Sequence, residues 1–470
     1  MPAALWWIRR DLRLDDNQAL QSACAAGKRV IPVFIMDPGL KLKPADKRQA
    51  FLNEGLASLD QELRKRKTHL ILRQGDPVEE LSRLLAETGA ERVYTEEDYS
   101  PDTSQQDTAA ARSLPLTFVT GMVVHPPDQV CKRDGSAYKV FTPFFKAWNE
   151  LPFSRQSQSQ VPVFLQPDKN ISSLPVPLSV GVGEFPATEA EAQRRLAAFL
   201  SGPVFEYDIG RDRLDWNGTS SLSPYLRFGL ISARKVVAAA RLAIEAAPDA
   251  DARLGAETWL KELAWREFYF NILFHFPNVL HEAFNPALRA IPWRDAPSDL
   301  RAWQAGMTGF PVVDACMRQL SGLGWMHNRG RMITASFLVK DLLIDWRLGE
   351  TWFMRNLVDG DPGANNGGWQ WTSGVGTDAA PYFRILNPVA QSQKWDPRGN
   401  FIRRWIPELA KVPPEFIHEP WLMPADLQQS ITCRIGRDYP APVVNHQSAK
   451  ERVIPLYKMT SSAYRSKEKE

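Results

Sequence analysis

The alternation of two apolar periodicities in the first 120 residues most constrains the fold of this 470-residue chain. Short apolar runs occur at residues 4–8, 30–36, 69–72, 92–94 and 116–119, with helical patterns between them at 17–26, 48–66 and 78–87. Apolar strands that alternate with helices are typical of a parallel sheet covered on both faces. We therefore predict an N-terminal α/β domain with a five-stranded, doubly wound parallel sheet.

The glycine-rich turn of dinucleotide-binding domains does not follow the first strand. Residues 9–14 read RRDLRL at this place, without a G-x-G-x-x-G pattern. If this domain binds a ligand, it does so without the pyrophosphate-binding turn.

The composition changes after residue 150. Residues 151–187 contain six Pro and six Ser, which disfavours regular elements and indicates a connector. Beyond residue 189 the apolar pattern is helical nearly to the end. We predict an α/β domain over 1–130, an interdomain connector over 131–200 and a large all-α domain over 201–470.

Charge and cysteine content exclude several classes of protein. Lys+Arg 57 against Asp+Glu 54 gives a net charge of +3, so any surface that binds nucleic acid must be local. The four cysteines are scattered, which argues against a disulfide framework or a metal site. No apolar run reaches the ~20 residues that span a bilayer. We expect a cytoplasmic monomer without a metal or a membrane partner.

Three segments of the helical region carry residues suited to chemistry. In the first, Gly218 precedes Thr219, Ser220, Ser221, Leu222 and Ser223. Hydroxyls and backbone N–H groups ahead of a helix can hold phosphates. Ordinary N-capping explains the same residues.

The second segment is a helical pattern at residues 257–269. Glu262, Trp265 and Tyr269 share one face of that helix, with Trp259 and Arg266 flanking Glu262. A carboxylate beside an aromatic ring suits a planar ligand. An amphipathic helix with a Glu262–Arg266 ion pair is the alternative.

The third segment runs from Asp359 to Trp371 and reads DGDPGANNGGWQW. Gly and Asn are poor residues for a helix interior, which favours a binding segment over a structural one. A hairpin-like turn at Asn366-Gly367 is the alternative.

Basic and aromatic residues alternate between the second and third segments, in GWMHNRGRM at residues 324–332. Cations that meet phosphates and flat groups that meet bases indicate a nucleic-acid surface. A solvated helix face explains the pattern as well.

Together these motifs resemble the DNA photolyase/cryptochrome family. The resemblance rests on W-x-RRDLRL-x-DN at residues 7–17, GTSSLS at 218–223, ELAWREF at 262–268, GWMHNR at 324–329, and DGD…NNGGWQW at 359–371. These motifs occur in order over residues 5 to about 457, and they most resemble class I cyclobutane pyrimidine dimer photolyases of microbial type.

The resemblance implies FAD in the helical domain, active when fully reduced. It assigns Tyr207 and Thr219 to Ser223 to the phosphates and ribose, and Arg331, Asp359 and Asp361 to the isoalloxazine. Trp259 and Arg266 are further cofactor residues on this mapping. Asn365 is the neighbour of flavin N5, where plant cryptochromes typically have Asp.

The resemblance also implies light-driven repair of UV-damaged DNA, a carbon–carbon lyase reaction. An electron passes from excited reduced FAD to a flipped-out dimer, the ring splits, and the electron returns. Glu262 and Trp265 contact the dimer and Met332 extends the apolar wall, with Glu262 stabilising the dimer radical anion. The implied DNA contacts are Arg211, Glu262, Trp265, Asn328, Met332 and Gln391.

Three tryptophans match the family's electron relay: Trp369 beside the flavin, then Trp346, then Trp303 towards the surface. Arg48 and Asp98 match an antenna site in the α/β domain, with an 8-hydroxy-deazaflavin chromophore favoured over a folate. The alternative function is a cryptochrome-like blue-light photoreceptor that uses the same FAD. Asn365, Glu262, Trp265 and the short tail after Lys458 argue against a photoreceptor.

Overall fold

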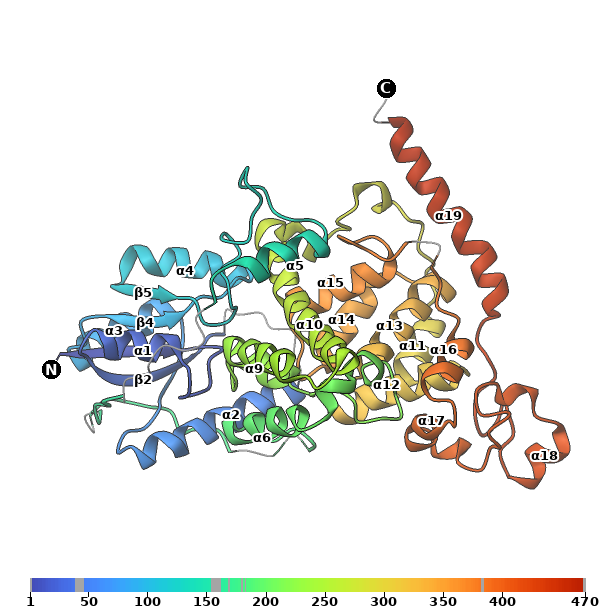
Figure 1. Ribbon diagram of the computed structural model, residues 1–470, viewed down its shortest axis with the longest axis horizontal. Helices are drawn as coiled ribbons and strands as arrows, with labels where there is room; N and C mark the ends of the chain where they lie inside the picture. The colour runs from blue at the N-terminus through green and yellow to red at the C-terminus, as the bar shows by residue number, and fades with distance from the viewer. Residues whose placement is uncertain are drawn as a thin grey trace. The chain divides into compact units, whose positions relative to one another are not determined.

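The computed structural model describes residues 2–38, 46–153, 162–167, 170–178, 181, 183–381 and 384–467. The chain divides into two compact units. Unit 1 consists of Met1–Tyr207 and Ser220–Pro277, and unit 2 of Asp208–Thr219 and Asn278–Glu470. Each unit is therefore built from two separate stretches of chain. Figure 1 shows the elements along the chain, from the N-terminal strands in blue to α19 in red.

A five-stranded sheet in the order β3-β2-β1-β4-β5 forms the N-terminal part of unit 1, and every pair of its strands is parallel. The strands are β1 (Ala3–Ile8), β2 (Arg29–Met36), β3 (Ile71–Gln74), β4 (Val93–Glu96) and β5 (Leu116–Val119). The short apolar runs of the sequence form these strands because both faces of the sheet are covered.

Helices cover both faces, as expected for a doubly wound sheet. They are α1 (Gln18–Ala25), α2 (Asp46–Lys65), α3 (Pro77–Thr88) and α4 (Pro101–Ser113). Leu81 and Leu84 of α3 pack with Leu5 and Trp7 of β1 on one face, and Trp6 faces the other side because strand residues alternate. The predicted α/β fold is confirmed. Helix α4 was missed because it buries only Thr103 and Ala110.

The polar RRDLRL segment after β1 folds into a buried network. Asp11 accepts hydrogen bonds from the Trp6 indole N–H at 3.0 Å, and Arg13 pairs with Glu96 at 2.6 Å. Burial raises the pKa of Glu96 to about 7 despite the charge of Arg13. Arg13 also donates to the carbonyl of Gly229 at 3.2 Å. The segment therefore holds the sheet to a later part of the chain.

The compact units do not follow the predicted domain boundaries, because residues 220–277 belong to the unit that contains the sheet. A Cβ atom at Gly229 would lie 1.9 Å from the carbonyl oxygen of Arg10, so the two backbones are in direct contact. The Ser232 hydroxyl bonds Asp16 at 2.5 Å. The helices of this part of unit 1 are α5 (Phe141–Glu150), α6 (Glu189–Leu200), η1 (Pro203–Glu206), α8 (Ser223–Phe228), α9 (Ala233–Ala246) and α10 (Ala250–His275).

The predicted connector over 131–200 also contains regular structure, because α5 and α6 lie inside it. Phe144 and Trp148 of α5 and Leu196 and Phe199 of α6 are buried. Much of the Pro- and Ser-rich stretch, including residues 154–161, lies outside the described residues. The irregular connector is therefore shorter than the sequence indicated.

Unit 2 is helical throughout its described part. Its main elements are α11 (Pro297–Ala305), α12 (Pro311–Leu323), α13 (Asn328–Ser336), η4 (Phe337–Asp341), α14 (Trp346–Asn356), α15 (Pro362–Ser373), α16 (Pro388–Trp395), α17 (Asn400–Trp405), α18 (Ala425–Ser430) and α19 (His446–Lys467). The short helices are α7 (Tyr207–Gly210), η2 (Pro277–Leu280), η3 (Pro286–Leu288), η5 (Pro407–Leu409) and η6 (Pro420–Leu422).

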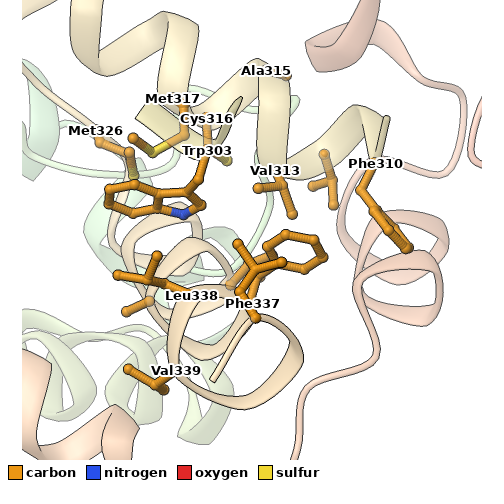
Figure 2. Packing of buried hydrophobic residues seen from close by; sticks show 14 of the residues in the cluster. Trp303, Phe310, Val313, Ala315, Cys316, Met317, Met326, Phe337, Leu338 and Val339 are labelled. Atoms are coloured by element: carbon orange, nitrogen blue, oxygen red, sulfur yellow. The ribbon is translucent and has the colours of Figure 1, made fainter. Parts of the chain in front are cut away.

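The core of unit 2 is one large apolar cluster centred on α11 to α15. Trp303 lies in it with Met326 and Leu338 close by (Figure 2). The helical apolar pattern of residues 331–347 does not form one continuous helix: α13 ends at Ser336, one π-turn follows, and Asp345 caps the start of α14. Apolar periodicity alone did not register this break, since residues 337–341 are all buried.

None of the helices in the described ranges is long and apolar enough to cross a membrane.

Candidate functional site

Trp265 on α10 presents a half-buried aromatic ring in unit 1. The ring of Phe141 stacks on it with centroids 3.9 Å apart and planes 7° apart, and Tyr269 lies 5.6 Å away. Glu262, one turn earlier on the same helix, is partly exposed. The structure thus places Glu262 and Trp265 on one side of α10, with the Trp265 ring fixed from behind by Phe141.

Neighbouring residues of α10 anchor the helix to unit 1. Glu267 accepts hydrogen bonds from the backbone N–H of Val124 and from the indole of Trp148, both at 2.6 Å. Burial raises the pKa of the Glu267 carboxyl. Arg266 donates to the carbonyl of Met122 at 3.0 Å. These anchors fix the rotation of α10 and therefore the direction of Glu262 and Trp265.

Tyr207 and Trp259, both expected at the cofactor, meet the same residue of unit 1. The ring of Phe199 lies 4.9 Å from Trp259 and 5.6 Å from Tyr207. Trp259 is 2% exposed. Trp259 therefore packs on Phe199 as a core residue does. Its contact with a cofactor stays a prediction.

The loop at residues 218–223 enters α8 without the capping that the sequence allowed. Leu222 is the N-cap and makes no side-chain capping bond, while Ser223 is already helical. Ser221 has φ 50, a left-handed conformation that is unfavourable for a residue with a side chain. In unit 2, a Cβ atom at Gly218 would lie 2.5 Å from the carbonyl of Gly210. N-capping therefore does not account for these hydroxyl residues.

Arg331 and Asp359 form an ion pair at 2.7 Å in unit 2, and the Asp359 side chain is 2% exposed. Arg331 also donates to the carbonyl of Met326 at 2.9 Å. In the part of the chain that the structure describes, Oδ1 of Asp359 is buried without a hydrogen-bond partner. A buried carboxylate oxygen of this kind is an acceptor for an N–H group of a ligand.

Asn365 is fixed by a residue that the sequence analysis missed, Glu350 of α14. The Asn365 side-chain amide donates to Oε1 of Glu350 at 2.8 Å and to its carbonyl at 3.1 Å. Since the amide is planar, its oxygen points away from Glu350. Glu350 lies fifteen residues earlier on another helix, so no local spacing indicates the pair.

Residues 362–373 form the helix α15, which rules out the alternative of a hairpin-like turn at Asn366-Gly367. Asp361 caps the helix by accepting from the N–H groups of Gly363 at 2.9 Å and Ala364 at 3.2 Å, and Pro362 occupies the first turn. Asn366 donates to the carbonyl of Val279 at 2.9 Å. Favourable capping and tertiary hydrogen bonds outweigh the low helix propensity of Gly and Asn.

Trp369 is 2% exposed and packs on Gly349 of α14. Trp346 lies one turn before Gly349 and therefore on the same face of α14. Trp303 is 0% exposed and its ring centroid is 6.1 Å from that of Trp369. Trp303 therefore does not lie towards the surface as expected, because its indole is inside the apolar core of unit 2 (Figure 2).

The predicted DNA contacts in unit 2 lie on three segments that bond to one another. Asp212, next to Arg211, pairs with Arg329 at 2.5 Å, and the Arg329 guanidinium lies 5.0 Å from the Trp395 ring centroid. Trp395 in turn donates to Gln391 at 3.1 Å. The structure therefore links the residue 208–219 segment to α13 and α16.

Asn328 and Met332 occupy successive turns of α13, and the Asn328 amide lies 4.0 Å from the Met332 sulfur. Asn328 is exposed and Met332 is half-buried. His327, which the sequence analysis quoted without a role, caps α13 by accepting from the N–H of Arg329 at 3.2 Å. Burial lowers the pKa of His327 to about 4, further helped by the nearby arginines and opposed by Asp212.

Of the two predicted antenna residues in unit 1, Arg48 is buried and Asp98 is half-buried. Asp98 pairs with Arg10 at 3.3 Å and accepts from Ser100 at 2.8 Å. Burial would raise the pKa of Asp98, but the charges of Arg10 and Arg9 outweigh it and lower the pKa to about 2. Arg48 lies in α2 with 4% exposure.

Two family models match the chain. The model described as DNA photolyase matches residues 4–163, and the one described as FAD binding domain of DNA photolyase matches residues 259–459. The deoxyribodipyrimidine photo-lyase of Alkalihalophilus pseudofirmus is 39% identical, with 96% of this chain and 97% of that protein covered.

Solved structures agree with this match. A bacterial class III photolyase from Agrobacterium tumefaciens superposes with a TM-score of 0.91 at 36% identity, covering 98% of both chains. A cryptochrome from Synechocystis sp. PCC6803 has a TM-score of 0.86 at 28% identity, covering 97% of this chain and 99% of that one. With its FAD-binding domain and full-length relatives, the chain belongs to the DNA photolyase family.

Proposed function

We propose that this protein repairs cyclobutane pyrimidine dimers in DNA with light and reduced FAD, in the manner of class I photolyases. The observation that carries the proposal is the arrangement on α13, α14 and α15. There the Arg331–Asp359 pair, the Asn365–Glu350 bond and the buried Trp369 all belong to one packed region of unit 2. Among the described residues, Oδ1 of Asp359 in this region is buried without a hydrogen-bond partner.

The residues present fit an FAD isoalloxazine. The unsatisfied Oδ1 of Asp359 can accept from an imide N–H, while Arg331 supplies a positive charge beside it. Bound reduced FAD would supply an electron on absorbing light. Tyr207, Trp259, Arg266 and residues 219–223 are the proposed partners of the rest of the cofactor, and Asp361 of its ring.

Asn365 offers an amide in place of a carboxylate. Glu350 holds the amide nitrogen, so the carbonyl oxygen is the group left to face a ligand. A neutral amide adds no negative charge beside a flavin, whereas a carboxylate would. This favours repair over the photoreceptor function.

Glu262 and Trp265 are the proposed dimer contacts. Trp265 is rigid because Phe141 stacks behind it, which lowers the entropy that a stacked ligand must remove. Glu262 can hydrogen-bond a pyrimidine edge and stabilise charge that develops there. A flipped-out lesion reaches such residues at a reduced cost when its base pair is already poorly stacked.

The test of repair uses dimer-containing oligothymidylate. We expect thymine absorbance to recover under near-UV or blue light with the FAD-loaded, reduced protein, and not in the dark. A (6-4) lesion assayed in parallel should not be repaired. Absence of light-dependent recovery from the dimer would refute the proposed function.

Glu262→Ala should lower the quantum yield of repair without abolishing it. Glu257→Ala is the matched control, because Glu257 lies on the same helix in an i,i+4 pair with Arg253. Full activity of the Glu262 variant would remove Glu262 from the dimer site.

Trp369 and Trp346 are the proposed first members of an electron relay, with Trp303 as a buried neighbour of Trp369. Trp369→Phe should block photoreduction of oxidised FAD and leave repair by chemically reduced protein nearly intact. Loss of both would contradict the assignment. Trp303→Phe tests whether this buried indole carries charge at all.

An antenna chromophore at Arg48 and Asp98, of the 8-hydroxy-deazaflavin type, is part of the proposal. It is supported by the buried cation of Arg48 and the half-buried carboxylate of Asp98 in the α/β part of unit 1. An absorption spectrum of the purified protein would identify the chromophore.

A further inference from the structure

Trp216 is an exposed tryptophan whose ring is in contact with a side chain that is itself fixed by an ion pair. Its side chain is 45% exposed, and the guanidinium of Arg213 lies 4.3 Å from the ring centroid. Asp215 fixes Arg213 with two parallel hydrogen bonds, at 2.8 Å to Nε and 2.7 Å to Nη2. A single exposed apolar residue is common on protein surfaces and needs no explanation. Here the indole is positioned by an arginine that Asp215 holds in a bidentate ion pair, which indicates a binding surface.

The loop that carries Trp216 is pinned on both sides. Leu214, two residues earlier, is 6% exposed and belongs to the core of unit 2. Gly218, two residues later, lies against the backbone of Gly210, with no room for a Cβ atom. The Trp216 ring is therefore preorganised, so a ligand that stacks on it immobilises little further.

A second indole with stacked cations lies on a segment bonded to this loop. The backbone N–H of Leu214 donates to the carbonyl of Trp395 at 3.0 Å. Arg329 and Lys394 lie 5.0 Å and 4.4 Å from the centroid of the Trp395 ring. Flat rings interleaved with cations are the chemistry that binds unpaired nucleic acid, in which bases stack and phosphates meet positive charge.

We propose that Trp216 is a stacking platform for an unpaired base of the bound DNA, beside the contacts proposed for Arg211 and Asn328. This inference rests on the proposed function, which supplies DNA as the ligand. The face of an indole cannot recognise the hydrogen-bonding groups of base edges in a DNA groove, but it can stack on the face of a base. That face is accessible only where the duplex is opened. The charge of Arg213 is already paired with Asp215, which argues against Arg213 acting simply as a phosphate-binding residue.

The test compares an undamaged duplex with the same duplex carrying a three-nucleotide mismatched bubble. Binding is measured in the dark by fluorescence anisotropy with the full-length FAD-loaded protein. Trp216→Ala should weaken bubble binding about fivefold to hundredfold, the effect of one lost base–aromatic stack, and leave duplex binding nearly unchanged. Trp216→Phe should retain most of the affinity, because it keeps an aromatic face.

Leu422→Ala is the control, because Leu422 is 58% exposed in the same unit and its side chain has no aromatic ring. It should bind both probes as the unaltered protein does. Unchanged bubble binding by Trp216→Ala would overturn the proposal, and so would an equal loss on duplex and bubble. If the unaltered protein repairs no dimer yet shows the Trp216-dependent bubble preference, the proposed repair fails and the stacking platform stands.

Discussion

Helices α10 and α15 both carry proposed site residues, and they form for different reasons. α10 is long and is capped by Asp249, whose side chain accepts from the Ala252 N–H at 2.8 Å. α15 is short and rich in Gly and Asn, and contacts from α14 and from residues 279–284 hold it in place. Local sequence accounts for α10, whereas tertiary contacts account for α15.

Gly349→Ala should have the largest effect, because it removes the space that α14 gives to Trp369 of α15. The new Cβ atom would lie 2.1 Å from Cη2 of Trp369, so the ring or the helix must move. We expect a loss of about 3 kcal/mol in the free energy of unfolding, measured with denaturant.

Gly368→Ala is the matched control inside α15, where a new Cβ atom meets nothing within 4 Å. It should leave stability unchanged or raise it by up to about 1 kcal/mol through helix propensity. Equal losses for the two variants would mean that α15 depends on glycine itself and not on the Trp369 contact.

Acid should distinguish the two units through His327 and Glu267. The pKa of His327 is lowered to about 4, so its stabilising contribution is present above pH 6.5 and is lost as the pH falls through 4. Glu267 on α10 has a raised pKa, so falling pH favours its buried, protonated form.

His327→Asn keeps a capping side chain and removes the titration. The stability of the unaltered protein should fall relative to this variant by up to about 3 kcal/mol between pH 6.5 and 4, at about 1.4 kcal/mol per pKa unit. Parallel pH curves for the two proteins would contradict the assigned pKa.

Gln370→Ala on α15 and the equivalent change on α10 should cost similar global stability, but only the first should increase local opening of its helix. Gln370 accepts from the N–H of Phe284 and donates to the carbonyl of Val279, both at 2.8 Å. On α10, Asn271 donates to the carbonyl of Pro127 at 2.9 Å. Either change to Ala should cost about 2 kcal/mol, since it leaves a buried polar group unsatisfied.

Hydrogen exchange separates the two cases. The amides of α15 should exchange faster in Gln370→Ala, whereas those of α10 should stay protected in Asn271→Ala. Equal protection in both variants would show that α15 needs no such anchor.

Asp249→Ala should have the smallest effect, about 1 kcal/mol, as expected for the loss of an N-cap. Asp249→Asn, which can still cap the helix, is the control and should be nearly neutral. A cost above about 3 kcal/mol for the alanine variant would mean that α10 depends on its first turn as strongly as α15 depends on its neighbours.

The proposed site also combines features that local sequence predicts with contacts that only the tertiary structure shows. The spacing of Glu262 and Trp265 on a helix was predictable because three residues make nearly one turn. The contact of Phe141 with Trp265, and of Glu350 with Asn365, joins residues far apart in the chain. No periodicity encodes such pairs.

The tryptophan path shows the limit most clearly. Motif matching selected Trp369, Trp346 and Trp303 and put Trp303 towards the surface, although no motif records how deeply a residue is buried. Burial of Trp303 beside Trp369 follows from the packing of α11 against α12 and α13, so only the three-dimensional core could exclude Trp303 as the surface end.

The sequence by itself determined the parallel sheet, the helical remainder and the family of the chain, because strand and helix periodicities and long motifs are local properties. Tertiary structure alone decided that residues 220–277 belong to the compact unit of the sheet, that the Gly- and Asn-rich segment after Asp361 is a helix and that Trp303 is buried. The physical reason is that buried polar groups and close backbone contacts take their partners from distant parts of the chain, and these contacts outweigh local propensity.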